Sequence, residues 1–388
     1  SGTSVSLGTA AVFESAETTW INATFDSSNN KVVISYLDAG NSNYGTAIVA
    51  TIDSSDNSVS YGSPVVFNSA STNQGKITFD SSNNKVVIAY NNGGDSGHGY
   101  AIVGTVSGTS ISFGSAAEFE NAVISDPAIT FDSSNNKVVI AYRDEGNSNY
   151  GTAIVGTVSG TSISYGSAAV YESANASETG MTFDSSNNKV VIAYNDGGNS
   201  NYGTAIVGTV SSTSISFGSA AVFESDNVSH ISATFDSNSN KVVIAYRDDG
   251  DSNQRYGTAI VGTVSSTSIS FGSATVFQSE RSEYISATFD SNAKKVVVAY
   301  RNDGGDGSDY GTAAVGTVSG TSISFGTPTV FESAATSYVA TTFDSNSNRV
   351  VIAYRDQGNS NYGTSIVLRN AFTSENLTTE NFIGTSAH

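Results

Sequence analysis

The sequence predicts an all-β fold, a seven-bladed β-propeller of four-stranded antiparallel blades. Three observations predict it. One motif recurs seven times along the 388-residue chain, each copy divides into four strand-like segments, and the chain begins with the segment that its last copy lacks. Repeats of about 40–50 residues with four strands each are typical of propeller blades.

The repeats are anchored by a Phe-Asp pair that precedes a polar turn and a Val-rich run. Successive anchors are 52 or 54 residues apart. They stand at Phe25, Phe79, Phe131, Phe183, Phe235, Phe289 and Phe343.

The third copy shows the four predicted strands in order. The first is Ile129–Asp132, and a Ser-Ser-Asn-Asn turn follows it, where Asn tolerates the left-handed backbone of a tight turn. The second, Lys137–Arg143, is apolar on both faces, which suits a sheet covered on both sides. A Gly/Asn loop then leads to Thr152–Val158, and a Ser-Gly turn leads to Ser162–Tyr171.

The fourth strand contains an interior glycine in every copy. Such a glycine usually marks a β-bulge or a close approach of another backbone. The set is Gly8, Gly62, Gly114, Gly166, Gly218, Gly272 and Gly326.

The two ends of the chain predict how the ring closes. Residues 3–14, TSVSLGTAAVFE, match the fourth strand, whereas the last copy stops at Asn370 without one. The N-terminal strand should therefore complete the last blade, which pairs both exposed sheet edges. We expect a propeller over residues 1–370 and a C-terminal tail or linker over 371–388.

Composition excludes several classes of function. There are 35 acidic and 16 basic residues, giving a net charge of −19. A nucleic-acid partner needs a basic surface, so none is expected. No apolar run reaches the roughly 18 residues of a membrane helix, so we expect no membrane insertion. The chain has no cysteine, which excludes disulfides and thiolate metal sites.

Comparison of the seven copies separates a uniform face from a variable one. The turns between the first two strands barely change, whereas the connection that precedes each anchor varies strongly. Variable loops on a rigid scaffold often carry function, and aromatic side chains there suit sugars or protein partners, although neutral drift on an exposed loop would also vary. Five positions before the anchors stand the candidate ligand-binding residues Trp20, Gln74, Asp126, Glu178, His230, Tyr284 and Tyr338.

Arginines precede four of the Gly/Asn loops on the same face: Arg143, Arg247, Arg301 and Arg355. A guanidinium group can bind a carboxylate or sulfate of an acidic glycan. The alternative, which we favour, is an ion pair with an Asp of the same loop, such as Asp144 or Asp248.

No catalytic constellation or cofactor is expected, and we predict a non-enzymatic protein. The three histidines share no repeat position, and no nucleophile elbow or phosphate loop is present. Asp38, Asn41 and Asn43 offer oxygen ligands that calcium would accept. Such residues in Gly-rich turns more often bond their own backbone, which is the interpretation we favour.

The text FDSSNNKVVIAYRDEGNSNYGTAIVGTVSGTSISYG (residues 131–166) resembles a repeat of tail-fibre and virion-associated proteins of marine bacteriophages, including those of cyanobacteria, over about residues 4–370. The resemblance implies a seven-bladed propeller in a host-adsorption apparatus and supplies no binding residues. It predicts a virion or extracellular location, a host cell-surface glycan or receptor as ligand, and other virion or tail proteins as partners. Three alternatives stay open: a structural protein–protein platform in a virion, a secreted bacterial lectin-like adhesin, and, less favoured, a glycan-cleaving enzyme using Asp126 and Glu178.

Overall fold

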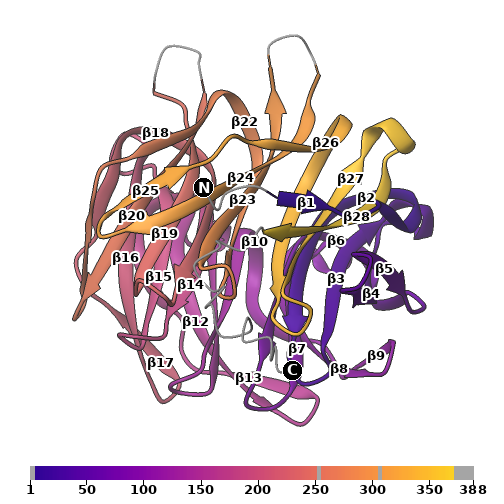
Figure 1. Cartoon of the computed structure of the whole chain (residues 1–388). Coiled ribbons are helices and arrows are strands. Elements are labelled where there is room, and N and C mark those ends of the chain that lie inside the picture. Colours follow the sequence, from indigo (N-terminus) through magenta and orange to yellow (C-terminus); the bar gives the residue numbers. More distant parts are fainter. Residues whose placement is uncertain (1–4, 251–254, 305–307, 371–388) are drawn as a thin grey trace, which may run out of the picture.

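The computed structural model describes residues 5–250, 255–304 and 308–370, and shows the predicted seven-bladed propeller (Figure 1). The described residues form 28 strands and four short 3-10 helices. The expected tail, 371–388, lies outside the described residues. Within the described residues, no helix is long and apolar enough to cross a membrane.

The third blade shows how each repeat folds. It consists of the second half of β10 (Ala117–Asp132), then β11 (Lys137–Asp144), β12 (Tyr150–Ser159), β13 (Ser162–Tyr165) and the first half of β14 (Ala169–Asp184). All neighbours pair antiparallel. The predicted strands are therefore present, and the fourth is divided in two because the chain leaves the ladder near its conserved glycine.

Seven strands of 16 residues each belong to two blades at once. The first half of β14 is the outer strand of one blade, pairing with β12, and its second half is the inner strand of the next blade, pairing with β15 (Lys189–Asp196). The others are β2 (Ala11–Asp26), β6 (Val65–Asp80), β10, β18 (Ala221–Asp236), β22 (Thr275–Asp290) and β26 (Thr329–Asp344). The expected loop between outer and inner strands is therefore wrong: the strand is continuous.

The remaining elements repeat the same order around the ring. The second strands of the other blades are β3 (Lys31–Asp38), β7 (Lys85–Asn92), β19 (Lys241–Asp248), β23 (Lys295–Asp303) and β27 (Arg349–Asp356). The third strands are β4 (Tyr44–Asp53), β8 (His98–Ser107), β16 (Tyr202–Ser211), β20 (Tyr256–Ser265), β24 (Tyr310–Ser319) and β28 (Tyr362–Asn370). The short outer strands are β1 (Val5–Leu7), β5 (Ser58–Tyr61), β9 (Ser110–Phe113), β17 (Ser214–Phe217), β21 (Ser268–Phe271) and β25 (Ser322–Phe325). The 3-10 helices are η1 (Ala39–Asn41), η2 (Gly93–Asp95), η3 (Glu145–Asn147) and η4 (Gln357–Asn359).

The N-terminal segment closes the ring, as predicted. Both β1 and the start of β2 pair antiparallel with β28, with Val5 opposite Asn370 and Ala11 opposite Ser365. Figure 1 shows β1 and β2 beside β28 at the junction of the two ends. The last blade thus takes its outer strand from the start of the chain, so neither sheet edge is left open.

The core lies between neighbouring blades. Each second strand is buried on both faces and carries one fully buried tyrosine: Tyr36, Tyr90, Tyr142, Tyr194, Tyr246, Tyr300 and Tyr354. The Tyr194 hydroxyl donates to Glu172 Oε2 at 3.2 Å, across a blade boundary. Burial and the adjacent carboxylate raise the pKa of Tyr194 far above its usual value. The equivalent tyrosine–glutamate hydrogen bond recurs in four other copies and links neighbouring blades there.

The uniform face is held by turns that use their own side chains. Asp132 Oδ1 accepts hydrogen bonds from the backbone N–H groups of Ser134 and Asn135, and Asn136 adopts φ +53°. A Cβ at Gly166 would lie 1.8 Å from the carbonyl oxygen of Thr213 in the next blade. The interior glycine therefore marks a close backbone approach, one of the two predicted possibilities.

Candidate functional site

The seven variable residues occupy one equivalent position on a β-bulge. Along β10 the pairing with β11 advances from Ser125 to Ala128 while its partner moves only from Arg143 to Ala141, so one extra residue is inserted. That bulge places Asp126 at φ +50°. All seven equivalents have φ between 50° and 55°: Trp20, Gln74, Asp126, Glu178, His230, Tyr284 and Tyr338.

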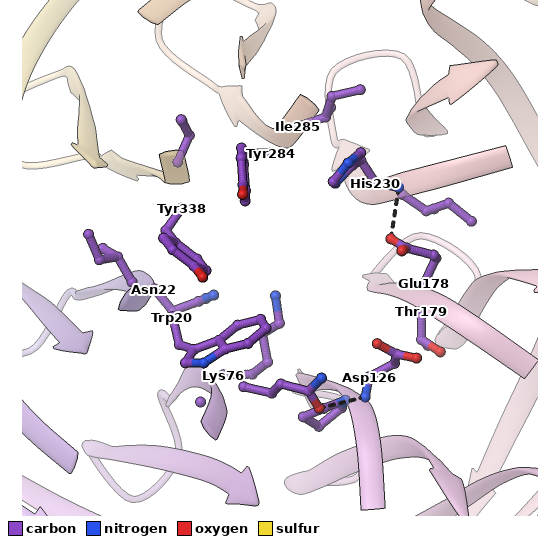
Figure 2. A pocket seen from close by; sticks show the side chains of 16 residues that line it. Trp20, Asn22, Lys76, Asp126, Glu178, Thr179, His230, Tyr284, Ile285 and Tyr338 are labelled. Carbon is purple, nitrogen blue, oxygen red and sulfur yellow. Dashed lines mark hydrogen bonds between the residues drawn. The ribbon is translucent and has the colours of Figure 1, made fainter. Parts of the chain in front are cut away.

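These seven side chains, the ring residues, converge on one cavity (Figure 2). The cavity has a volume of about 300 Å³ and is lined by all seven ring residues and their neighbours. Because each ring residue comes from a different long strand, the cavity is surrounded by every blade. The structure therefore brings together residues that are up to 318 positions apart in sequence, from Trp20 to Tyr338.

One half of the ring is an aromatic arc, His230–Tyr284–Tyr338–Trp20. Consecutive ring centroids are 5.5, 5.2 and 5.2 Å apart, and the planes are inclined by 46° to 63°. Inclined contacts at this distance are favourable for aromatic pairs. The arc presents a contiguous wall of π-surface to the cavity.

The other half is a polar arc, Gln74–Asp126–Glu178. Gln74 Oε1 accepts a hydrogen bond from the Asp126 backbone N–H at 2.9 Å, and Glu178 Oε2 accepts from the His230 N–H at 2.8 Å (Figure 2). Each side-chain oxygen thus accepts from the backbone N–H of the ring residue in the next blade. Since a carboxylate has several lone pairs, Asp126 and Glu178 keep acceptor capacity for a ligand.

Burial shifts the protonation of both arcs. It raises the pKa of Asp126 and of Glu178, although Arg143 opposes the shift at Asp126 and the His230 N–H opposes it at Glu178. Burial and the nearby Arg247 lower the pKa of His230 to about 4. His230 is therefore a neutral ring at physiological pH and acts with the tyrosines as part of the aromatic wall.

Lys76 lies deeper in the cavity, two residues after Gln74. It also lines a second space of about 180 Å³ that shares Asn22 and Thr179 with the first. Burial lowers the pKa of Lys76, while Asp126 and Glu178 oppose that shift. Among the described residues, no hydrogen-bond acceptor lies within bonding distance of its ammonium group.

Lys76 was not among the residues selected from sequence, although a signal existed. The six equivalents in the other copies are uncharged: Asn22, Ala128, Gly180, Ser232, Ser286 and Ala340. Extending the comparison of copies two positions past the ring residue would have identified the only charge in that column.

The four arginines flank the ring and are paired with acidic groups. Arg143 contacts Asp126 at 3.5 Å and Glu145 at 3.3 Å. The expected partner Asp144 instead accepts from the Asn147 backbone N–H at 3.0 Å. Asp248 has the same capping role, since its Oδ1 accepts from the Gly250 N–H. The favoured ion pairs therefore exist, but with other acids, because the predicted aspartates cap the loops that follow them.

The other arginines form ion pairs with acidic side chains, and two of them also lie over tyrosines of the aromatic arc. Arg247 contacts Asp249 at 2.8 Å, and Arg355 contacts Glu17 at 3.0 Å. Arg355 lies over the Tyr338 ring and Arg301 over the Tyr284 ring, with 5.0 and 5.2 Å between the guanidinium carbon and the ring centroid. These cation–π contacts favour the observed positions of the Tyr284 and Tyr338 rings.

Glu283 is a second site residue that sequence analysis did not select. It precedes Tyr284, where the other copies carry Thr, Asn or Ser, and its carboxylate contacts Arg247, Arg281 and Arg301. Burial alone would raise the pKa of Glu283, but the three arginines lower it. The cluster joins two neighbouring blades beside the aromatic arc.

The calcium candidates serve the local backbone. Asp38 Oδ1 accepts from the Asn41 N–H at 3.2 Å, capping η1, and Asn43 adopts φ +62°. Their geometry is that of a capped turn, in which Asp side chains commonly bond their own backbone. For Asp38 these contacts are the backbone bonding that the sequence analysis favours over calcium.

The fold and site together define a closed seven-bladed propeller with a polar–aromatic pocket on its axis. No protein-family model and no curated protein matches the sequence. Among solved structures, the chain is similar to the BP39L lectin of Burkholderia pseudomallei, with a TM-score of 0.65 and 9% identity over 92% of this chain and 97% of that one. It is also similar to a triple arginine-to-alanine mutant of AofleA from Arthrobotrys oligospora, with a TM-score of 0.50 and 7% identity over 85% and 91%. At these identities the likeness establishes the fold.

Proposed function

We propose that the protein is a non-enzymatic carbohydrate-binding module whose axial pocket holds one terminal sugar of a cell-surface glycan. One observation carries the proposal. Seven nearly identical blades carry six residue types at the position that converges on the pocket, and those side chains divide into an aromatic arc and a polar arc.

The two arcs match the two aspects of a sugar ring. The C–H face of a pyranose is apolar and packs on aromatic surface such as Trp20 and Tyr338. Its hydroxyls donate to the carboxylates of Asp126 and Glu178 and accept from the Lys76 ammonium group. A cavity of about 300 Å³ lies at the small end of ligand pockets, which suits one sugar residue.

The charge distribution favours a neutral sugar over an acidic one. The four flanking arginines, whose guanidinium groups are suited to a carboxylate or sulfate, are already paired with acidic side chains or stacked on tyrosines. Two carboxylates line the cavity against one lysine, and the chain carries a net charge of −19. An anionic ligand would therefore be repelled.

The residue types at the ring are not explained by the backbone. A left-handed conformation favours Gly, Asn, Asp and His, yet only Asp126 and His230 of the seven ring residues belong to that set. Large side chains such as Trp and Tyr are costly there, and backbone strain of this kind concentrates at functional sites. A lectin role is also consistent with the BP39L lectin sharing the fold.

The biological setting follows from the sequence resemblance to phage tail-fibre repeats. We propose an extracellular, virion-associated role in which the pocket recognises a host-surface glycan. The resemblance supports this setting, and the pocket chemistry supports the ligand class.

A glycan array followed by calorimetric titration tests the function. Gly75 lines the cavity, and a Cβ there would meet no atom within 4 Å, so Gly75→Phe places a ring in the pocket while Gly75→Ala, which adds only the Cβ, is its matched control. We expect the native protein and Gly75→Ala to bind a neutral glycan and Gly75→Phe to lose at least tenfold in affinity. Equal affinity of all three proteins would exclude the axial pocket, and an array without any bound glycan would exclude the ligand class.

A further inference from the structure

A cluster of three potential metal ligands lies in the second copy, away from the axial pocket. Asp95 ends η2, His98 begins β8 and Glu118 lies near the start of β10. His98 Nδ1 is 2.8 Å from Glu118 Oε1 and 3.7 Å from Asp95 Oδ2, and the three ligand atoms all lie within 4.8 Å of one another. None of these residues lines the axial cavity.

The other copies show that the blade does not need these residues. The position of His98 is held elsewhere by Tyr44, Tyr150, Tyr202, Tyr256, Tyr310 and Tyr362. The position of Glu118 is held by Val12, Val66, Val170, Val222, Val276 and Val330. The position of Asp95 is held in the copies of equal loop length by Asn41, Asn147, Asn199 and Asn359.

A fourth departure coincides with the other three. Tyr100 stands where the other copies have Thr46, Thr152, Thr204, Thr258, Thr312 and Thr364, and it pairs directly across the strands with Glu118. Its hydroxyl donates to Asp95 Oδ2 at 2.6 Å. In this copy alone, the Tyr, Val, Asn and Thr of the other copies are thus replaced by four polar residues that contact one another.

We propose that Asp95, His98 and Glu118 bind one divalent transition-metal ion of the Zn²⁺ class, with Tyr100 orienting the Asp95 carboxylate. One imidazole nitrogen and two carboxylate oxygens form a donor set that Zn²⁺ accepts, whereas Ca²⁺ and Mg²⁺ prefer oxygen alone. Bonds of about 2.0–2.1 Å place neighbouring ligand atoms roughly 3–3.4 Å apart, so the observed separations need only small side-chain movements.

The surroundings favour a cation. The two carboxylates place a formal charge of −2 beside a histidine, and in the part of the chain that the structure describes no lysine or arginine forms a salt bridge with either. The three side chains are partly exposed, at 24% for His98, 46% for Asp95 and 38% for Glu118. Water can therefore complete the coordination, and the ion has an open path to the site.

Calorimetric titration of metal-free protein with ZnCl₂ tests the proposal. The matched variant is His98→Tyr with Glu118→Val, which installs the residues of the other blades and should fold as they do. We expect about one equivalent of Zn²⁺ to bind the native protein, with at least a hundredfold weaker binding to the double variant, by roughly tenfold or more for each lost ligand. Tyr100→Phe should weaken binding by about tenfold.

Further measurements distinguish loss of the metal site from damage to the axial pocket or to the fold. His230→Phe, which changes the axial pocket, should retain the Zn²⁺ site, and glycan binding should be equal in native protein and in His98→Tyr/Glu118→Val. Thermal unfolding without metal checks that the double variant folds. No binding of Zn²⁺ by the native protein, or equal affinity in the double variant, would overturn the proposal and leave His98–Glu118 as a surface hydrogen bond.

Discussion

The inner strand of every blade has a left-handed residue near each end, and the two ends behave differently. At one end, the turn into the second strand has φ between 53° and 56° at Asn30, Asn84, Asn136, Asn188, Asn240, Lys294 and Asn348. At the other end, the ring residues adopt the same conformation with seven side chains of six residue types. The same backbone requirement has therefore produced uniformity at one rim and diversity at the other.

The difference shows which of the two positions follows the preference of the backbone. Asn is the residue that a left-handed turn favours, so the turn end follows backbone energetics. The ring end departs from them and places Trp and Tyr where they are strained. On the proposed function, the ring residue types reflect what the pocket binds.

The largest effect is expected when the aromatic arc is removed. Trp20→Ala with Tyr338→Ala deletes two adjoining rings 5.2 Å apart and should weaken glycan binding by about a hundredfold, roughly 3 kcal/mol. Calorimetric titration measures it. Tyr310→Ala is the matched control, because that tyrosine is exposed in β24 and does not line the cavity. A loss below threefold in the double variant would mean that the ring does not bind the sugar.

The two arcs should respond to pH with opposite sign. The folded-state pKa of His230 is lowered to about 4, so the unfolded chain takes up the proton first and stability falls as the pH drops from about 6.5 towards 4. The pKa values of Asp126 and Glu178 are raised in the folded state, so these groups increase stability as the pH falls through their raised values towards the ordinary range near 4.

Urea unfolding at pH 7 and pH 4.5 checks both signs. His230→Tyr should lose less stability on acidification than the native protein, by on the order of 2 kcal/mol. Glu178→Gln should lose more than the native protein. If both variants shift in the same direction, the assigned protonation of the ring is wrong.

A smaller effect on binding is expected from the polar arc. Glu178→Gln keeps an acceptor for the His230 N–H but replaces a charged acceptor for the sugar, so affinity should fall by about tenfold, roughly 1.4 kcal/mol. Glu280→Gln removes the same charge from an exposed position and should leave affinity unchanged. Equal titration curves for Glu178→Gln and the native protein would place the ligand on the aromatic arc alone.

The fold could be predicted from the sequence because the same four-strand pattern occurs seven times. The seven anchors predicted the number of blades, and the match of residues 3–14 to an outer strand predicted the closure. The bulge at Asp126 escaped prediction because it lies inside a continuous strand, and a run of varied polar residues is typical of a loop. The ring position was still found, since variation among copies does not depend on knowing the backbone.

The parts of the site that could not be predicted depend on contacts between blades. Arg247 was expected to pair within its own loop, yet it also reaches Glu283 of the next blade at 3.0 Å. Such a contact joins residues that only the folded blades bring together, so linear spacing contains no sign of it. For Lys76 the copies do mark the only charge in its column, and only its place in the cavity depends on closure of the ring.

The smallest effect tests the turn end alone. Lys294 is the one residue other than Asn at that position, in an exposed turn with φ +56°. Because Asn tolerates this conformation better, Lys294→Asn should stabilise the protein by about 0.5–1 kcal/mol, and the reverse change Asn188→Lys should cost a similar amount. Urea unfolding measures both. Glycan affinity should stay within twofold of native in each, since the turn lies at the opposite rim from the pocket. A change in affinity that tracks the change in stability would show that the two ends of the strand are coupled, and that the uniform rim contributes to recognition as well as to folding.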